Sequence, residues 1–155
     1  MIYITRSEEE TMRFSGAIAG MLSAGDTVML HGDLGTGKSV FARGIARAMG
    51  VQGAMPSPTF TLLIPYEGRC KIYHYDLYRL NDPDEFYAAG LDEFIGGDGV
   101  ALVEWPEMAD VDPQPALSIY IERMADNTEM RLIRIENDGV RGFDEAKIED
   151  WRENK

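Results

Sequence analysis

The stretch Gly32-Asp-Leu-Gly-Thr-Gly-Lys-Ser39 has the spacing G-x-x-x-x-G-K-S of a phosphate-binding loop. A short apolar run suited to a buried strand, Thr27–His31, precedes it, and a helix-like segment that ends near Gly50 follows it. Glycine permits backbone conformations closed to other residues, so successive amides can converge on one phosphate chain. The positive end of a helix beginning at Lys38 strengthens that attraction. The sequence therefore predicts a nucleotide-binding P-loop.

Two side chains of this loop have expected roles of their own. The Lys38 ammonium should reach the β- and γ-phosphates, and the Ser39 hydroxyl should hold Mg²⁺. The residues predicted to bind the nucleotide are Gly35, Thr36, Gly37, Lys38, Ser39 and Val40.

The composition fits one enzyme-sized domain over residues 1–155. With 155 residues, 45% of them hydrophobic, the chain can bury one sizeable core. The single cysteine, Cys70, excludes an internal disulfide and a cysteine-rich zinc site, and it favours a reducing cytoplasm. We expect neither a signal peptide nor a membrane span, because no window approaches 18 apolar residues. A net charge of −12 argues against independent nucleic-acid binding, although an acidic surface also serves solubility.

Hydrophobic periodicity predicts helices and strands along the whole chain. Ser7 and Glu10 form an S-x-x-E capping box, which opens a helix whose buried face reaches Leu22. The continuous apolar run 100–103 is typical of a strand buried on both faces. The other expected strands are 2–4, 61–66, 71–78, 117–123 and 130–136, and the other expected helices are 83–89, capped by Asn81 or Asp82, and 142–151.

Two carboxylates are candidates for work on the phosphates. Glu104 directly follows the run 100–103, and in P-loop hydrolases an acid at the tip of such a strand holds Mg²⁺ or polarises the attacking water. Asp76 stands in an aromatic strand, where burial of a carboxylate is costly without a cation. Mg²⁺ would satisfy Asp76, but so would Arg79 or Lys71, and both interpretations stay open.

Three further features carry less information. The segment Ser57-Pro-Thr-Phe60 is a stiff loop with hydroxyls that could sense a γ-phosphate and Mg²⁺, although Pro-Ser-Pro is also a common turn. A lone histidine in a strand, such as His74, is more often a hydrogen-bonded packing residue than a catalyst. Trp105 could stack on a base or on a partner residue, but most tryptophans simply pack.

Together these residues resemble the bacterial TsaE (YjeE) family. The matching segments are, in order, the phosphate loop, Ser57-Pro-Thr-Phe-Thr61, His74-Tyr-Asp-Leu-Tyr-Arg-Leu80, Ala89-Gly-Leu-Asp-Glu93 and Leu102-Val-Glu-Trp-Pro-Glu107. The phosphate loop is shared with many families, whereas H-x-D-L-Y-R and V-E-W-P are typical of this one. The resemblance implies a P-loop NTPase-like, three-layer α/β fold whose central sheet is mostly parallel with some antiparallel strands.

The resemblance also implies an activity. Family members are small P-loop ATPases required to make N6-threonylcarbamoyladenosine in tRNA. They bind a heterodimer of TsaB and the transferase TsaD, and they do not transfer the threonylcarbamoyl group themselves. For this chain the resemblance implies ATP and Mg²⁺ as cofactors, catalytic roles for Lys38, Asp76 and Glu104, and metal binding by Ser39 and Glu104. It also places Thr59 in a switch-like loop.

Other expectations from the resemblance concern the base and the partners. The adenine pocket would draw on residues 8–11 and on a turn between the last two strands, which here reads Asn127-Thr128 in place of the usual Gly-Arg. Residues 138–155 match no pattern. The acidic charge fits a tRNA held indirectly, through the partner complex. No arginine finger in cis is evident, so the free protein should be slow and a partner should stimulate it.

Two alternatives from other classes stay open. A P-loop small-molecule kinase would pass the γ-phosphate to a hydroxyl acceptor, but such enzymes usually carry an arginine-rich lid, and this chain has only scattered arginines such as Arg69 and Arg79. A non-catalytic, nucleotide-gated adaptor would use binding alone to control assembly. The absence of an N-K-x-D guanine-reading motif favours ATP over GTP.

Overall fold

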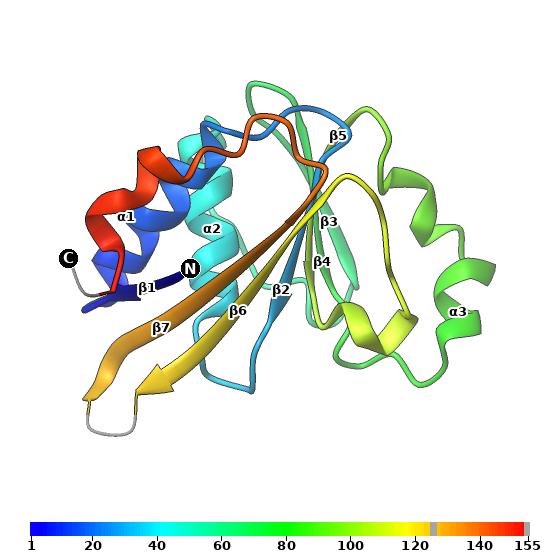
Figure 1. Ribbon diagram of the computed structural model, residues 1–155. Helices are drawn as coiled ribbons and strands as arrows, with labels where there is room; N and C mark the ends of the chain where they lie inside the picture. Colours follow the sequence, from blue (N-terminus) through cyan, green and yellow to red (C-terminus); the bar gives the residue numbers. More distant parts are fainter. Residues whose placement is uncertain (125–126, 154–155) are drawn as a thin grey trace.

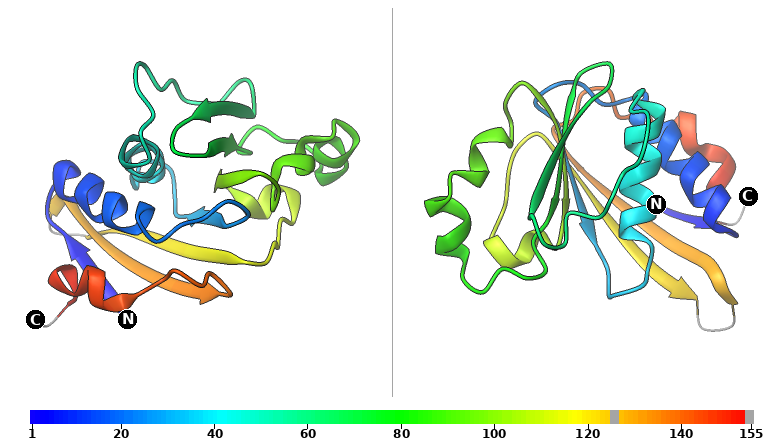
Figure 2. Two further views of the ribbon diagram at one scale, coloured as in Figure 1. Left: turned by 90° about the horizontal axis from the view of Figure 1, so that it is seen from above. Right: turned by 180° about the vertical axis from the view of Figure 1, so that it is seen from behind.

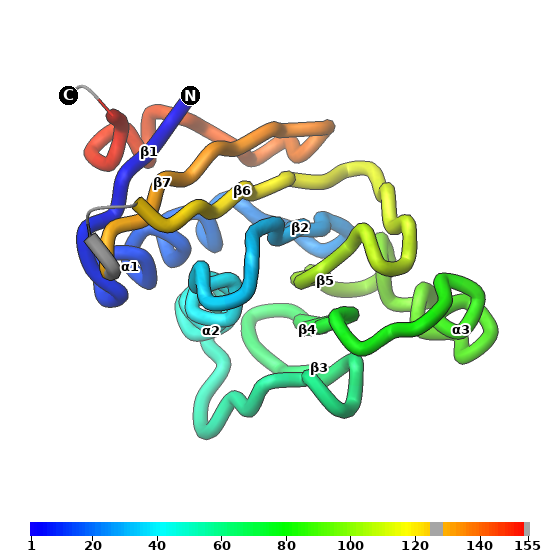
Figure 3. The backbone as a smooth tube through the Cα atoms, turned by 90° about the horizontal axis from the view of Figure 1, so that it is seen from below, coloured from blue at the N-terminus to red at the C-terminus, as the bar shows by residue number. Residues whose placement is uncertain are grey.

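The computed structural model describes residues 1–124 and 127–153, and all strands within these ranges belong to one sheet. The strands are β1 (Ile2–Thr5), β2 (Thr27–His31), β3 (Leu63–Glu67), β4 (Lys71–Asp76), β5 (Gly99–Glu104), β6 (Ala116–Met124) and β7 (Asn127–Asp138). Their order is β1-β7-β6-β2-β5-β4-β3, which Figure 3 shows from below. The central strands β6, β2, β5 and β4 are mutually parallel, whereas β7 and β3 run in the opposite direction. The expected mostly parallel sheet is confirmed.

Helices cover both faces of this sheet. They are α1 (Glu8–Ala19), α2 (Lys38–Ala48) and α3 (Pro83–Ala88), with the short 3-10 helices η1 (Leu91–Phe94), η2 (Pro106–Ala109) and η3 (Glu145–Trp151). Figure 1 shows α1 and α2 on one side of the sheet and α3 on the other, and the view from behind in Figure 2 repeats this three-layer arrangement. None of the helices in the described ranges is long and apolar enough to cross a membrane.

The strand β5 shows why the sheet needs two helical layers. All six of its residues are buried, as the apolar run 100–103 predicts. Val100 and Leu102 belong to the core under α1 and α2, while Ala101 and Val103 belong to the core under α3. Because successive side chains of a strand point to opposite faces, an unbroken apolar run must be covered twice.

The parallel direction of β2, β4 and β5 gathers their carboxyl ends at one edge of the sheet. The phosphate loop follows β2, Asp76 ends β4 and Glu104 ends β5. In open α/β sheets, ligands bind outside these carboxyl ends. The topology thus positions the predicted site before any side chain is considered.

Several element boundaries differ from the sequence-based expectation. Helix α1 ends at Ala19, so Met21 and Leu22 are buried but lie beyond it. The side chain of Asp82, not Asn81, caps α3 by accepting a hydrogen bond of 2.9 Å from the amide of Asp84. The strands β6 and β7 are longer than expected, and β7 begins at Asn127, where a turn was predicted.

The C-terminal segment closes the sheet at β1. The expected helix 142–151 is shorter, and it is a kinked 3-10 helix, η3. The Trp151 ring packs edge-on against Phe14 of α1 with 5.4 Å between ring centroids, and the amide of Glu153 donates to the Ile2 carbonyl at 2.8 Å. Residues 151–153 therefore lie against helix α1 and the outer edge of β1, although they match no family pattern.

Candidate active site

The phosphate loop is a tight turn between β2 and α2. Gly35 and Gly37 have φ angles of 80° and 102°, in the left-handed region that glycine adopts without strain. Gly37 immediately precedes the first residue of α2, so the unpaired amides of the helix start lie at the loop. A cavity of about 520 Å³ lies against this loop, a size typical of small-molecule sites.

The cavity brings together all the residues predicted for the site. Its lining includes Gly35, Thr36, Gly37, Lys38, Ser39, Val40, Asp76 and Glu104. Ser57 and Thr59 of the proline-marked loop also line it, as does Glu8 at the start of α1. The roles of these residues in binding and catalysis stay predictions, but the arrangement that those roles require is present.

The Lys38 side chain is only 5% exposed and is held inside the loop. Its Nζ donates to the carbonyl of Gly32 and, at 3.2 Å, to that of Asp33. It also lies 3.7 Å from the centroid of the Trp105 ring, a cation–π contact. Burial lowers the pKa of Lys38, while the nearby carboxylates, Glu104 foremost, oppose that shift. Phosphate oxygens could take the place of the two carbonyls as partners of this ammonium.

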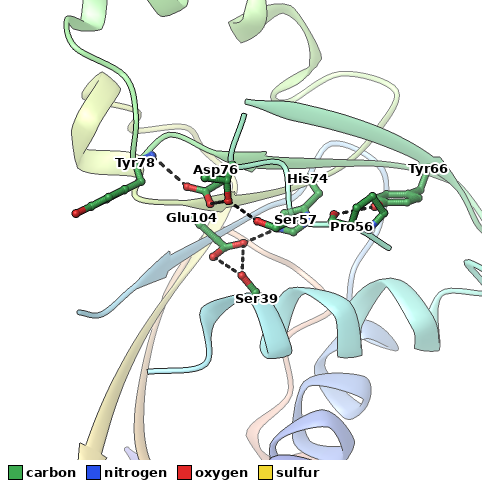
Figure 4. Close-up of polar contacts among 9 residues, drawn as sticks. Ser39, Pro56, Ser57, Tyr66, His74, Asp76, Tyr78 and Glu104 are labelled. Atoms are coloured by element: carbon green, nitrogen blue, oxygen red, sulfur yellow. Dashed lines mark hydrogen bonds and ion pairs between the residues drawn. The ribbon is translucent and has the colours of Figure 1, made fainter. Parts of the chain in front are cut away.

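Ser39 and Glu104 face each other directly. The Ser39 hydroxyl, in the first turn of α2, donates to both carboxylate oxygens of Glu104 at 3.0 and 3.2 Å (Figure 4). The first turn of α2 and the tip of β5 thus lie on the same side of the cavity, as a shared metal ion requires. The predicted pairing of these two residues has the geometry on which the mechanism depends.

A second carboxylate lies beside Glu104. Asp76 and Glu104 are paired in register across the parallel strands β4 and β5, and they are only 7% and 3% exposed. Like charges placed opposite each other across strands are destabilising, and buried carboxylates need a cation or hydrogen-bond donors. Mg²⁺ prefers oxygen ligands and usually takes one or two carboxylates together with phosphate oxygens. The oxygens of Ser39, Asp76 and Glu104 therefore fit this ion.

His74 is a site residue whose importance sequence reasoning missed. It is 4% exposed, and its Nε2 lies 2.6 Å from the Oε2 atom of Glu104 (Figure 4). The expectation of a hydrogen-bonded packing residue is met, but the partner is the candidate metal ligand itself. The available signal was the spacing H-x-D, because period-2 alternation puts His74 and Asp76 on one face of β4.

The contacts of Asp76 test one of the alternatives left open for it, neutralisation by a neighbouring basic residue. Thr59 Oγ1 donates to Asp76 Oδ2 at 3.3 Å, and the amide of Tyr78 donates to Oδ1 at 3.1 Å. Lys71 instead lies 3.8 Å from Asp98, and the Arg79 guanidinium stacks 4.2 Å from the Phe60 ring centroid. The interpretation that Lys71 or Arg79 neutralises Asp76 is therefore wrong.

A smaller cavity of about 140 Å³ adjoins the phosphate loop on the side of α1. Its lining includes Glu8 and Thr11 of α1, Val40 of α2, and Arg131 of β7. The Nε of Arg131 donates to the Thr36 carbonyl at 2.6 Å, and burial, followed by the charge of Arg123, lowers the pKa of Arg131. Glu8 and Thr11, the first and last residues of the segment expected near the base, therefore line a cavity next to the phosphate loop. The side chains of Asn127 and Thr128 lie outside the described residues, so this predicted part of the base site has no description.

Comparison with known proteins assigns the chain to a family. Residues 5–133 match the family model described as "Threonylcarbamoyl adenosine biosynthesis protein TsaE". The chain belongs to the TsaE family. The resemblance expected from the phosphate loop and from the H-x-D-L-Y-R and V-E-W-P segments is therefore confirmed.

Individual TsaE relatives agree with this assignment, and each carries the name tRNA threonylcarbamoyladenosine biosynthesis protein TsaE. The protein of Treponema pallidum is 38% identical over 79% of this chain and 92% of its own length. The protein of Rickettsia bellii is 40% identical over 87% of this chain and 94% of its own length. The protein of Bacillus subtilis is 40% identical over 79% of this chain and 78% of its own length. The crystal structure of Bacillus subtilis YdiB superposes with a TM-score of 0.77 at 33% identity and covers 97% of this chain and 93% of that one.

Proposed function

We propose that this TsaE-family protein is a Mg²⁺-dependent ATPase that acts in the synthesis of threonylcarbamoyladenosine in tRNA. The observation that carries the proposal is the contact between Ser39 and Glu104, with Asp76 in register beside Glu104, at the edge of the phosphate loop. Family membership supports the process, because the relatives are named for threonylcarbamoyladenosine biosynthesis.

The proposed reaction converts ATP and water into ADP, inorganic phosphate and a proton. The water oxygen bonds to the γ-phosphorus, and the bond from that phosphorus to the β–γ bridging oxygen breaks, leaving its electron pair on ADP. Lys38 would exchange its carbonyl partners for phosphate oxygens and balance their charge. In this proposal Asp76 and Glu104 would orient the water, and with Ser39 they would hold Mg²⁺; the contact of Ser39 with Glu104 and the register of Asp76 beside it support these roles. When bound, Mg²⁺ supplies positive charge to the phosphate oxygens.

The proposed partners are TsaB and TsaD, with tRNA bound through that complex. The net charge of −12 supports the indirect contact, because phosphate neutralisation by basic residues dominates affinity for nucleic acids. A cytoplasmic location is part of the proposal, and the single cysteine is consistent with it. We expect slow hydrolysis by the free protein and faster hydrolysis in the complex.

The experiment follows the γ-phosphate of labelled ATP with Mg²⁺, using the protein alone and with TsaB, TsaD and tRNA. We expect free phosphate that increases when the partners are added. Label found on a small acceptor would instead support the kinase. Repeated tRNA modification with a non-hydrolysable ATP analogue would support the adaptor. Turnover that is fast alone and unchanged by TsaB and TsaD would contradict the proposed partnership.

A further inference from the structure

The cavity at the phosphate loop contains an arginine to which the proposed reaction gives no role. Arg79 follows β4 and lines the cavity together with Lys38, Asp76 and Glu104. Its guanidinium carbon lies 4.2 Å from the centroid of the Phe60 ring, which is 80% exposed. An exposed phenylalanine costs solvation and has little to pack against, but its ring can fix the plane of a guanidinium group.

The charge of Arg79 has no carboxylate partner within ion-pair distance in residues 1–124 and 127–153. Asp76, three positions away, takes its hydrogen bonds from Thr59 and Tyr78 instead. Of the other cavity cations, Lys38 is bound to loop carbonyls and Arg131 to the carbonyl of Thr36. The exposed Arg79 guanidinium lines the cavity, so its donors are accessible to a ligand bound there.

The position of Arg79 indicates which end of the nucleotide it would meet. Two neighbouring residues of one loop contact the end of β4: Thr59 bonds Asp76, and Phe60 stacks on Arg79. This group lies with the candidate metal ligands, whereas Arg131 and Glu8 mark the side of the smaller cavity. We expect the terminal phosphate beside Ser39, Asp76 and Glu104, because these residues would hold the Mg²⁺ that supplies positive charge to the phosphate oxygens.

We propose that Arg79 binds the terminal phosphate and stabilises the charge that develops on it during hydrolysis, and that Phe60 is its positioning residue. The inference rests on the proposed function and deepens it. The reaction is the one given above: as the bond to the bridging oxygen breaks, negative charge grows on that oxygen and on the γ-phosphate oxygens. A guanidinium group in this place would act as an arginine supplied in cis, which the sequence analysis did not identify, and P-loop enzymes with such an arginine can still hydrolyse slowly without a partner. In the sequence, Arg79 is the last residue of the H-x-D-L-Y-R segment, but that pattern did not indicate a role for it.

The test compares Arg79→Ala and Phe60→Leu with the control Arg141→Ala, which removes an exposed arginine that does not line the cavity. Affinity is measured for ADP with Mg²⁺ and for ADP with Mg²⁺ and aluminium fluoride, which imitates the transferring phosphate. We expect Arg79→Ala to weaken the aluminium fluoride complex by about tenfold or more and to lower kcat similarly, with ADP affinity within about twofold. Phe60→Leu should lie between wild type and Arg79→Ala, and Arg79→Lys should restore only part of the loss.

The outcomes separate the two proposals. An Arg79→Ala protein that binds the aluminium fluoride complex as well as Arg141→Ala does would overturn the role of Arg79 alone. Equal losses for ADP and for the complex would overturn it as well, since they would show general attraction or altered folding; thermal melting identifies the latter. A wild-type protein that binds neither ATP nor ADP would overturn the proposed function, and the role of Arg79 with it.

Discussion

The two loops that line the cavity are built in contrasting ways. The phosphate loop, 32–39, joins β2 directly to α2, and Thr36 and Lys38 within it are buried. The facing loop, 55–62, is marked by prolines, exposes Ser57 and Phe60, and reaches β4 through a 3.3 Å hydrogen bond and a cation–π contact. The first is tied to the core through these buried side chains, whereas the second adds to these two contacts a backbone hydrogen bond of 3.0 Å from the Asp76 amide to the Leu62 carbonyl. We therefore expect the phosphate loop to anchor the nucleotide and the facing loop to respond to its terminal phosphate.

The largest effect should come from the buried carboxylate between the two loops. Glu104→Gln keeps the shape of the side chain but removes a charge needed for water and metal, so we expect turnover to fall at least about 100-fold. ATP binding should persist. Steady-state hydrolysis and calorimetric binding measure the two effects, and Glu107→Gln, which lies outside this cavity, is the matched control. Unchanged turnover would remove Glu104 from the mechanism.

Lys38→Met should weaken the binding of both ADP and ATP, and of ATP at least as strongly, because the Lys38 ammonium is expected to reach the β- and γ-phosphates. Loss of charge-assisted hydrogen bonds worth about 3 kcal/mol corresponds to about 100-fold in affinity. Titration with both nucleotides measures the loss. A variant that retained wild-type affinity would contradict the predicted phosphate site.

The stability difference between Lys38→Met and the wild-type protein, both without nucleotide, should depend on pH. Burial lowers the pKa of Lys38, so the charged form is disfavoured by folding. This penalty is present below the lowered folded-state pKa and disappears as pH rises through it toward the unfolded value. Thermal melting should therefore show Lys38→Met at least as stable as wild type at neutral pH, with the advantage shrinking at alkaline pH. An advantage that grew with pH would contradict the sign of the shift.

His74→Ala should have a smaller effect on the same carboxylate. Without the 2.6 Å contact, Glu104 loses a group that fixes its orientation, so we expect kcat to fall about tenfold and the Mg²⁺ requirement to rise. ADP affinity measured without Mg²⁺ should not change, and His74→Asn should recover part of kcat. His31→Ala removes a histidine outside this cavity and serves as the control. Equal losses in the asparagine and alanine variants would favour a merely structural role.

Thr59→Val should have the smallest effect, and it tests whether the two loops differ in function. The valine cannot donate to Asp76, and a hydrogen bond of about 1 kcal/mol corresponds to a change of about fivefold. We expect ATP affinity and turnover to fall by that amount while ADP affinity is kept, because the facing loop responds to the terminal phosphate. The control is Thr61→Val, at an exposed position of the same loop. Equal effects on ATP and ADP would show that this loop also anchors the nucleotide.

Local sequence patterns predicted most of the fold because they act over short distances. The capping box at Ser7, the glycines of the phosphate loop and the apolar run of β5 each fix a local conformation. Boundaries were less accurate where tertiary contacts decide them. The 3-10 form of η3 depends on packing against α1 and β1, and Leu62 takes a φ of 67° where an extended residue was expected.

The residues of the candidate site could be predicted from the sequence, but the contacts between them could not. Lys38, Ser39 and Glu104 follow from motif and position at strand ends. The bond from His74 to Glu104 and the stack of Arg79 on Phe60 depend on register between β4 and β5 and on the path of a loop. Neither register nor loop path is encoded in local spacing, so both required the structure.

Because residues 151–153 pack against α1 and β1, they affect the design of a minimal fragment. The family match ends at residue 133 and begins at residue 5, so a fragment cut at these limits would lose most of β1, the end of β7 and all of η3. Phe14 and the outer rim of the sheet would then meet water, and bare strand rims invite self-association. A fragment that purifies well should therefore include residues on both sides of the range 5–133 that the family model matches.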